Sequence, residues 1–256
     1  MSNIYEQDDS LSQYLLLHYG ADRDVLPYDN GPEEALNYPV RCVQNLVDPA
    51  SIGPGARALD VGCAVGRSTF ELAALCDGTL GIDTSSRFIE TARTLAESGR
   101  VSHYRIDEGD IRTAMDFCVP ASLPRDRAQF EVGDACSPRA DIGAFEIVFC
   151  ANLIDRLPDP GVFLGALSDR VVSGGQLIIT SPFTWLEEFT PRENWIGGTV
   201  RDGRPRHTWD QLCALLEKHF TLRATMDLPF LIREHARKFQ WSIARGGRWT
   251  RRQDED

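Results

Sequence analysis

Two glycines and a later carboxylate are the residues whose types and spacing most directly suggest a chemistry. Gly62 and Gly66 follow the apolar run 56–61 and precede a helix-like segment, and Asp83 ends a second apolar run 21 residues after Gly62. Glycine lets the backbone approach a ligand, a helix N-terminus presents free N–H groups, and the later acid can accept from both ribose hydroxyls. The pattern predicts a nucleotide-type cofactor, whereas a glycine pair alone would also fit a structural strand–turn–helix.

Ala64 narrows the choice of cofactor. It stands where a dinucleotide fingerprint has its middle glycine, which normally lets a pyrophosphate approach. A methyl group there disfavours NAD or FAD, whereas S-adenosylmethionine has no phosphate and tolerates it. Asp134 and Ala135 follow the next strand-like run, 129–132, and suit an adenine edge, with a simple β-turn as the alternative. The sequence therefore predicts S-adenosylmethionine, with S-adenosylhomocysteine as its product, and Asn152 and Asp155 then lie where substrate would meet it.

Composition bounds the class of protein. The 256 residues are 42% hydrophobic and 25% charged, with a net charge of −11, which is ordinary for a soluble domain and lacks the basic footprint of a nucleic-acid binder. Seven cysteines without a Cys-x-x-Cys pair and five dispersed histidines favour reduced thiols and no metal site. A polar N-terminus and the absence of a long apolar run predict a cytoplasmic protein that does not contact a membrane.

The elements that must position these residues alternate along the chain. Apolar runs and helical periodicity predict an α/β fold with a doubly wound, mostly parallel sheet whose last strand is antiparallel, preceded by an N-terminal helical extension. The expected strands are 56–61, 79–83, 129–132, 145–150, 176–180, and two near 219–226 and 237–245. The expected helices are 8–19, 39–47, 68–76, 87–98, 162–172 and 208–218.

The chain is expected to form a single domain, 1–256, with residues 1–50 as its N-terminal helical extension. Three segments do not fit the alternation of strands and helices. Residues 100–128 are too long for a plain connection and predict an extra hairpin or helix. Residues 181–207 follow a strand's carboxyl end and are rich in aromatic, glycine and charged residues, which predicts a loop covering the substrate. The charged stretch 248–256 is expected to be a flexible tail.

Together these motifs, in this order, resemble the class I S-adenosylmethionine-dependent methyltransferases with their Rossmann-like fold, over residues 40–245. Other stretches resemble one family more narrowly, the ovothiol-biosynthesis N-methyltransferases that act on the imidazole ring of 5-thiohistidine (4-mercaptohistidine). The stretches are Gln-Tyr-Leu at 13–15, His-Tyr-Gly at 18–20, Asn-Tyr-Pro-Val-Arg-Cys at 37–42, Thr-Trp-Leu-Glu-Glu-Phe-Thr at 184–190, Trp-Ile-Gly-Gly at 195–198 and Arg-Glu-His-Ala-Arg-Lys-Phe-Gln-Trp at 233–241. The resemblance implies a standalone enzyme linked functionally to an upstream sulfoxide synthase and lyase.

Site roles follow from the motifs and from the substrate that the resemblance implies. The expected cofactor-binding residues are Tyr14, Tyr19, Arg41, Asp60, Gly62, Cys63, Ala64, Gly66, Asp83, Thr84, Asp134, Ala135 and Asn152. The expected substrate-binding residues are His18, Trp185, Glu187, Glu188, Arg192 and Trp195, with Asp155 and Asn152 holding the imidazole N–H as catalytic residues. No metal ligand is expected.

Each role has a structural alternative. The aromatic residues of 8–19 are as compatible with packing, Arg41 with a surface salt bridge, and Asp83 with a helix N-cap, a role that Thr84 or Ser85 also suits. The residues of 181–207 fit an exposed charged loop with aromatic anchors. For the whole protein, the alternatives are a methyltransferase for another small amine, phenol or amino acid, a non-catalytic S-adenosylmethionine-binding sensor or partner, and, more distantly, an NAD-linked dehydrogenase.

Overall fold

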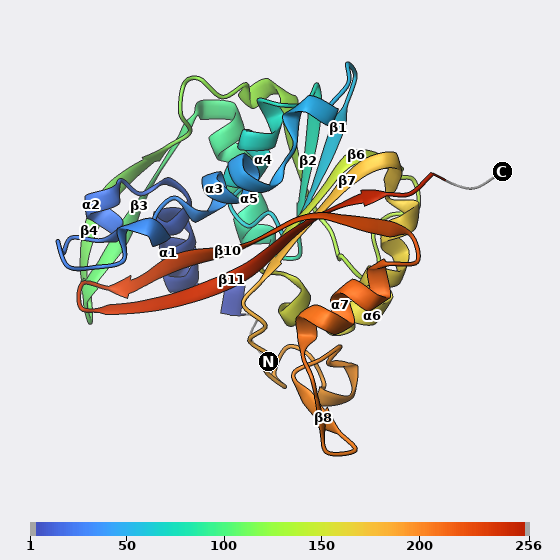
Figure 1. The fold of residues 1–256 in the computed structure, drawn as a ribbon. Helices are drawn as coiled ribbons and strands as arrows, with labels where there is room; N and C mark the ends of the chain where they lie inside the picture. Colours follow the sequence, from blue (N-terminus) through green and yellow to red (C-terminus); the bar gives the residue numbers. More distant parts are fainter. Residues whose placement is uncertain (1–3, 254–256) are drawn as a thin grey trace.

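Strands of mostly buried apolar residues form a central sheet of seven strands in the computed structural model, which describes residues 4–253 (Figure 1). Their order across the sheet is β10-β11-β7-β6-β1-β2-β5. The bounds are β1 (Arg57–Val61), β2 (Gly78–Asp83), β5 (Ala128–Val132), β6 (Phe145–Ala151), β7 (Val171–Ser181), β10 (Phe220–His235) and β11 (Lys238–Arg251). β1 pairs in parallel with β2 and β6, as do β2 with β5 and β6 with β7. β11 pairs antiparallel with both β7 and β10, so the predicted sheet with an antiparallel last strand is confirmed.

Helices cover both faces of the sheet, as a doubly wound fold requires. On one face lie α3 (Tyr38–Leu46), α4 (Arg67–Ala73) and α5 (Ser86–Ser98), and on the other lie α6 (Pro160–Ala166) and α7 (Thr208–Leu216) (Figure 1). Successive residues of β1 alternate between the two faces: Ala58 packs with the α3 cluster, and Leu59 packs with the α6 and α7 cluster. This alternation is the two-residue period of a strand buried on both faces.

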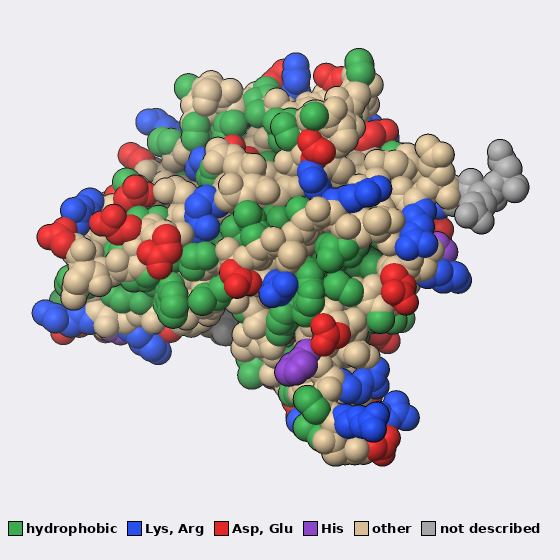
Figure 2. Space-filling view, in the orientation of Figure 1, with side chains coloured by type: hydrophobic (Ala, Val, Ile, Leu, Met, Phe, Trp, Pro, Cys, Tyr) green, Lys and Arg blue, Asp and Glu red, His purple; other side chains and the backbone are tan. Residues whose placement is uncertain are grey.

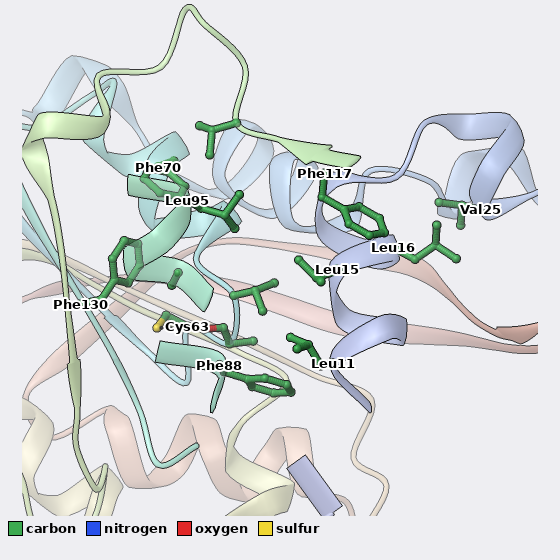
Figure 3. Close-up of a cluster of buried hydrophobic side chains, with 14 of the residues drawn as sticks. Leu11, Leu15, Leu16, Val25, Cys63, Phe70, Phe88, Leu95, Phe117 and Phe130 are labelled. Carbon is green, nitrogen blue, oxygen red and sulfur yellow. Dashed lines mark hydrogen bonds between the residues drawn. The ribbon is translucent and has the colours of Figure 1, made fainter. Parts of the chain in front are cut away.

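The N-terminal extension packs beside the sheet, as expected, and its first three residues lie outside the described part. It contains η1 (Ile4–Glu6), α1 (Asp8–Tyr19), α2 (Asp22–Val25), η2 (Glu33–Ala35), α3 and η3 (Pro49–Ser51). Figure 3 shows Leu11, Leu15 and Leu16 of α1 directed into a buried cluster with Phe88 and Cys63. α1 is thereby fixed against the turn that follows β1.

The long segment after α5 forms the expected extra hairpin, β3 (Arg100–Glu108) and β4 (Ile111–Cys118), followed by η4 (Arg125–Arg127). A charged network ties this hairpin to the tip of β10. Buried Arg233 pairs with Asp107 at 3.3 Å and donates to the Asp24 carbonyl at 2.5 Å, and Arg105 pairs with Asp24 at 2.7 Å. The hairpin, α2 and β10 are thus held together at one end of the molecule.

Three sequence predictions need correction at the C-terminal side. The helix expected at 162–172 is short and followed by η6 (Leu167–Asp169), because Val171 pairs with Phe145 and already belongs to β7. Strands β10 and β11 run well beyond the predicted 219–226 and 237–245. The start of the expected tail, residues 248–251, instead belongs to β11, since Trp249 pairs with Leu177 inside the sheet and is buried. Residues 254–256 lie outside the described part.

The segment expected to be a covering loop has structure of its own. The segment 181–207 contacts η5 (Ile154–Arg156), because the Arg156 guanidinium donates to the Thr184 carbonyl. It contains η7 (Arg192–Asn194) and a projecting hairpin, β8 (Thr199–Arg201) and β9 (Arg204–Arg206). Figure 2 shows Lys and Arg side chains gathered at the tip of this projection, where Arg201 and Arg204 are exposed. Among residues 4–253, no helix has the length and apolar character needed to cross a membrane.

Candidate active site

The turn after β1 has the backbone geometry that its glycines predict. Gly62 and Gly66 have φ of 76° and 87°, and Ala64 also takes a left-handed φ of 48°. The N–H groups of Gly62 and Cys63 donate to the Ile82 carbonyl at 2.8 and 3.0 Å. A Cβ at position 66 would lie 2.6 Å from the Phe130 ring. The turn therefore requires glycine at 66 for both conformation and space.

Asp83 joins this turn to the second strand. Its Oδ2 accepts from the Ala64 N–H at 3.0 Å and its Oδ1 from the Ser85 N–H at 2.9 Å. The helix cap is Ser85, whose Oγ accepts from the Phe88 N–H at 3.1 Å, and Thr84 is exposed. Each oxygen of a carboxylate has two acceptor positions. With the Thr84 N–H as a further backbone partner, the carboxylate still has acceptor capacity for a ribose hydroxyl, and its ribose contact stays a prediction.

Asp60 is a buried acid at the end of β1. It is 1% exposed and accepts from the Thr69 hydroxyl at 2.7 Å. Burial raises its pKa from 3.8 to about 7. A nearby cation such as an amino group would restore the charged form, so the residue suits the cofactor's amino-acid end.

The aromatic residues of α1 dock this helix on the glycine turn. The Tyr19 hydroxyl donates to the Val65 carbonyl at 2.7 Å, and the His18 Nδ1 accepts from the Arg67 N–H at 3.3 Å. Burial, with a smaller contribution from Arg67, lowers the pKa of His18 to about 3, so its ring is neutral. The Tyr14 ring packs 4.9 Å from Phe88. These contacts favour the packing alternative for the three rings, and their contact with cofactor or substrate stays a prediction.

Arg41 and Asp134 also make local contacts. The Arg41 guanidinium donates to the Leu36 carbonyl at 2.7 Å and to the Pro229 carbonyl, which joins α3 to β10. Its partners are thus backbone carbonyls and not the carboxylate of the salt bridge given as the alternative. Asp134 is exposed, and its Oδ1 accepts from the Cys136 N–H at 2.8 Å, as in a turn. Its second oxygen keeps the adenine contact possible, and that contact, with the one predicted for Ala135, stays a prediction.

Asp155, predicted to hold the imidazole N–H, is hydrogen-bonded to residues at the start of the segment 181–207. It is fully buried; Oδ1 accepts from the Ser181 hydroxyl at 3.0 Å, and Oδ2 accepts from the Thr184 N–H at 2.9 Å. Arg156 lies 3.1 Å from Oδ2. Burial raises the pKa of Asp155. The geometry favours a carboxylate that fixes the start of 181–207 over one that holds a substrate ring.

The two tryptophans of 181–207 lie against each other. Their rings stack with centroids 5.9 Å apart and planes at 22°, the separation of a direct aromatic pair. The Trp185 indole N–H donates to the Thr208 hydroxyl at 2.9 Å and that of Trp195 to the Thr190 carbonyl at 2.8 Å. They therefore do not enclose a ring between them, and a contact of their outer faces with the substrate ring stays a prediction.

The charged residues of the same segment are at the surface. Glu187 and Arg192 form an exposed ion pair at 3.7 Å, and the Arg192 guanidinium lies 4.9 Å from the Trp195 ring centroid. Glu188 is also exposed. This arrangement is the exposed charged loop that the sequence left as an alternative, and contacts of these three side chains with a substrate stay predictions.

Asn152 belongs to a polar cluster that the sequence did not reveal. Its Oδ1 accepts from the Tyr38 hydroxyl at 2.8 Å, and the Thr180 hydroxyl, 2.7 Å from the Tyr38 oxygen and 3.2 Å from Oδ1, has one proton to give to either of them. Tyr38 lies in the stretch 37–42 that carries the family resemblance, so that stretch was the available signal. Asn152 itself is partly exposed at the carboxyl end of β6.

A short N-terminal segment, also unanticipated, covers the end of β2. The Ser85 hydroxyl donates to the Tyr5 carbonyl at 3.1 Å, and Glu6 accepts from the Ser86 N–H at 2.9 Å. The Tyr5 ring lies 6.1 Å from Phe189 of the segment 181–207. The segments 4–6 and 181–207 thus meet beside the residues that follow β2.

A pocket of about 460 Å³ lies beside α5 and is lined in part by Glu6, Arg87 and Val101. None of the predicted site residues lines it. The described residues include no group of three or more His, Cys, Asp or Glu side chains placed to hold a metal ion. The site is therefore defined by the ends of β1, β2, β5, β6 and β7, where parallel strands place ligands.

Comparisons with known proteins agree with this geometry. A family model described as a methyltransferase domain matches residues 52–218. A ubiquinone biosynthesis O-methyltransferase from Xanthomonas axonopodis pv. citri (strain 306) is 29% identical over 153 residues, which are 59% of this chain and 52% of that protein. One from Aromatoleum aromaticum (strain DSM 19018 / LMG 30748 / EbN1) is 29% identical over 128 residues, 50% of this chain and 44% of that protein. The chain spans about half the length of these curated relatives.

Solved structures show the same fold. Magnesium protoporphyrin IX methyltransferase from Synechocystis PCC 6803, with bound S-adenosylmethionine, has a TM-score of 0.53 at 15% identity, covering 98% of this chain and 100% of that one. The N-methyltransferase NodS from Bradyrhizobium japonicum WM9, with S-adenosylhomocysteine, has a TM-score of 0.51 at 14% identity, covering 95% and 99%. S-adenosylmethionine is the cofactor of this fold, and the carboxylate acceptors of Asp83 and Asp60 fit it. Since the family model covers more than half of it, the chain belongs to the methyltransferase domain family, with the class I fold of S-adenosylmethionine-dependent methyltransferases.

Proposed function

We propose that this protein transfers a methyl group from S-adenosylmethionine to an imidazole ring nitrogen of 5-thiohistidine, the last step of ovothiol A formation. One observation supports this acceptor most directly. Three of the stretches that carry the narrow family resemblance are far apart in sequence, yet they contact one edge of the sheet. Tyr19 bonds the glycine turn, Tyr38 bonds Asn152, and the Thr184 N–H bonds Asp155. Residues outside the generic cofactor motifs therefore contact the strand ends to which we assign the acceptor.

The chain's own residues would hold the cofactor through complementary charge and hydrogen bonds. Asp83 would accept from the ribose hydroxyls, Asp134 from the adenine amine, and Asp60 would face the amino group. When bound, S-adenosylmethionine supplies an electrophilic methyl group on a sulfonium. The acidic residues at three strand ends thus match a ligand with hydroxyl, amine and ammonium donors.

An imidazole acceptor suits the state of the nearby titratable groups. The ring nitrogen gives its lone pair to the methyl carbon, and the electron pair of the broken carbon–sulfur bond returns to sulfur. A neutral ring nitrogen needs no base for this step. Asp155 and Tyr38 are already hydrogen-bonded within the protein, so the work left to the chain is orientation and exclusion of water, which can supply roughly 7–11 kcal/mol.

The curated relatives favour a second candidate, methylation of a phenolic oxygen. Those proteins are named ubiquinone biosynthesis O-methyltransferases. A phenol with a pKa near 10 must lose its proton for efficient attack. His18 is neutral, but its Nδ1 already accepts from the Arg67 N–H and its ring is buried, so the described geometry assigns no free base to this reaction. A non-catalytic S-adenosylmethionine-binding protein is the remaining alternative.

Mass spectrometry of the full chain with S-adenosylmethionine decides among these candidates. The acceptors are 5-thiohistidine, histidine and catechol in separate reactions, with cofactor binding measured in parallel by calorimetry. The proposal expects one methyl group on a ring nitrogen of 5-thiohistidine and none on histidine or catechol. Methylated catechol alone would favour the second candidate. Binding of S-adenosylhomocysteine with no methylated product from any acceptor would favour a non-catalytic role.

A further inference from the structure

Three polar side chains from distant parts of the chain meet beneath the loop that follows β6. Tyr38 begins α3, Thr180 lies near the end of β7, and Asn152 follows β6. The Tyr38 and Thr180 hydroxyl oxygens lie 2.7 Å apart, and both contact the Asn152 Oδ1, at 2.8 and 3.2 Å. Tyr38 is 3% exposed and Thr180 is fully buried. Two buried hydroxyl groups, of Tyr38 and Thr180, therefore contact the side chain of the partly exposed Asn152.

The backbone of Asn152 is fixed by the same neighbours. Its N–H donates to the Thr180 carbonyl at 2.8 Å, and its φ of 52° lies in the left-handed region that asparagine tolerates better than most residues. With both backbone and Oδ1 held, the carboxamide has one orientation. Its Nδ2 carries two donors, and neither has a hydrogen-bond partner among residues 4–253. Asn152 is partly exposed and directly follows the carboxyl end of β6, so these donors remain for a ligand at that edge.

We propose that Tyr38 and Thr180 are positioning residues that turn the Asn152 amide so that its NH₂ group donates to the acceptor substrate. This inference rests on the proposed function and sharpens it. The sequence predicted that Asn152 would accept from an imidazole N–H, but its oxygen already accepts from the Tyr38 hydroxyl, which the Thr180 hydroxyl supports at 2.7 Å. A donor requires an acceptor on the substrate, and on 5-thiohistidine we assign it to the thiolate sulfur.

A hydrogen bond to the thiolate would control which atom is methylated. The thiolate is the stronger nucleophile of the substrate, and a bond donated to it stabilises its lone pairs and lowers their reactivity. A donor placed on the attacked ring nitrogen would instead occupy the lone pair that reacts. The Asn152 amide is therefore assigned to regioselectivity, directing the methyl group to nitrogen and away from sulfur.

The test measures the ratio of N-methyl to S-methyl product for four variants with 5-thiohistidine. Tyr38→Phe and Thr180→Val each remove one supporting hydroxyl, and Asn152→Asp replaces the NH₂ group with an oxygen. Thr180→Ser restores the hydroxyl that Thr180→Val lacks. The matched control is Tyr28→Phe, which removes a hydroxyl bonded to the Ala236 carbonyl on an exposed ring, outside the site.

We expect the N-to-S ratio to fall by roughly 10- to 100-fold in Asn152→Asp, the effect of losing a hydrogen bond to a charged group, and by a smaller factor in Tyr38→Phe and Thr180→Val. Thr180→Ser should recover most of the ratio, and Tyr28→Phe should match the wild type. The Kd for S-adenosylhomocysteine should stay within about twofold in Tyr38→Phe, Thr180→Val, Thr180→Ser and Tyr28→Phe.

Two results would overturn the inference while leaving the proposed function intact. One is a wild-type ratio in Asn152→Asp, which would mean that the amide oxygen faces the substrate. The other is a parallel loss of activity and S-adenosylhomocysteine binding in Tyr38→Phe with an unchanged ratio, which would mean a structural role. A wild-type chain that methylates no 5-thiohistidine while it binds cofactor would overturn the proposed function itself, and the inference with it.

Discussion

Replacing Asp60 with asparagine should raise the stability of the protein at neutral and alkaline pH while weakening cofactor binding. Asp60 is 1% exposed, and burial raises its pKa from 3.8 to about 7. Burial therefore disfavours its charged form in the folded state. Asparagine has nearly the same shape, still accepts from the Thr69 hydroxyl, and carries no charge to desolvate.

The sign and size of the effect follow from proton linkage. Because the folded pKa is higher than the unfolded one, the unfolded chain binds fewer protons at Asp60 between pH 4 and 7. The free energy of unfolding therefore falls as the pH rises through this window. The span from 3.8 to about 7, at about 1.36 kcal/mol per pH unit, is on the order of 4 kcal/mol. Asp60→Asn removes this dependence, so it should be more stable than the wild type at pH 8 but not at pH 4.

Urea unfolding of both proteins at pH 4, 6 and 8 measures this difference directly. Asp110→Asn is the control, since its side chain is fully exposed. The reasoning would be refuted by a difference between Asp60→Asn and wild type that stays constant from pH 4 to 8. Calorimetry at pH 8 should show S-adenosylmethionine bound at least tenfold more weakly by Asp60→Asn, because a carboxylate facing the cofactor's ammonium is lost; equal affinity would refute the assignment of Asp60 to that end of the cofactor.

Three further predictions test other parts of the site. Gly66→Ala should cost about 2–3 kcal/mol in the free energy of unfolding, since φ is 87° and the new Cβ would lie 2.6 Å from Phe130. Gly55→Ala, with a φ of 77° and open space, separates strain from collision and should cost only about 1 kcal/mol; equal losses would show that the Phe130 contact is unimportant. Asp83→Ala should weaken S-adenosylhomocysteine binding about 100-fold by calorimetry while the far-ultraviolet circular dichroism is unchanged, and retained affinity would remove its ribose role. Asp155→Asn should raise the acceptor KM several-fold in steady-state assays and keep regiochemistry, and a matching change in cofactor Kd would contradict a role confined to the segment 181–207.

The fold and the cofactor turn could be predicted because their signals are local. Alternating apolar strands and helices imply a doubly wound sheet, and such a sheet brings the carboxyl ends of its parallel strands to one edge. The sequence therefore predicted that the glycine turn and Asp83 lie together, and in the structure the Asp83 carboxylate accepts from the Ala64 N–H between Gly62 and Gly66. Even the extra hairpin at 100–128 was signalled by a connection too long to be a plain loop.

Side-chain roles in the predicted substrate segment could not be predicted in the same way. Trp185 and Trp195 have the composition of a ring-binding wall, yet they stack on each other because the backbone between them folds back through η7. Asp155 was expected to hold an imidazole N–H, yet its oxygens accept from the Ser181 hydroxyl and the Thr184 N–H. Residue type suggests what a side chain can do, but its partners decide what it is free to do.

By itself the sequence determined the class of fold, the cofactor and the strand ends at which the site lies, because hydrophobic periodicity and glycine conformation act over a few neighbouring residues. Only the tertiary structure decided how the acceptor side of the site is built. Tyr38 reaches Asn152 across 114 positions and Thr180 across 142, and no local pattern encodes such a contact. Buried hydroxyls need hydrogen-bond partners because they are removed from water. Which partner each of them finds depends on how α3 packs against the strands β6 and β7, and a local sequence pattern does not carry that information.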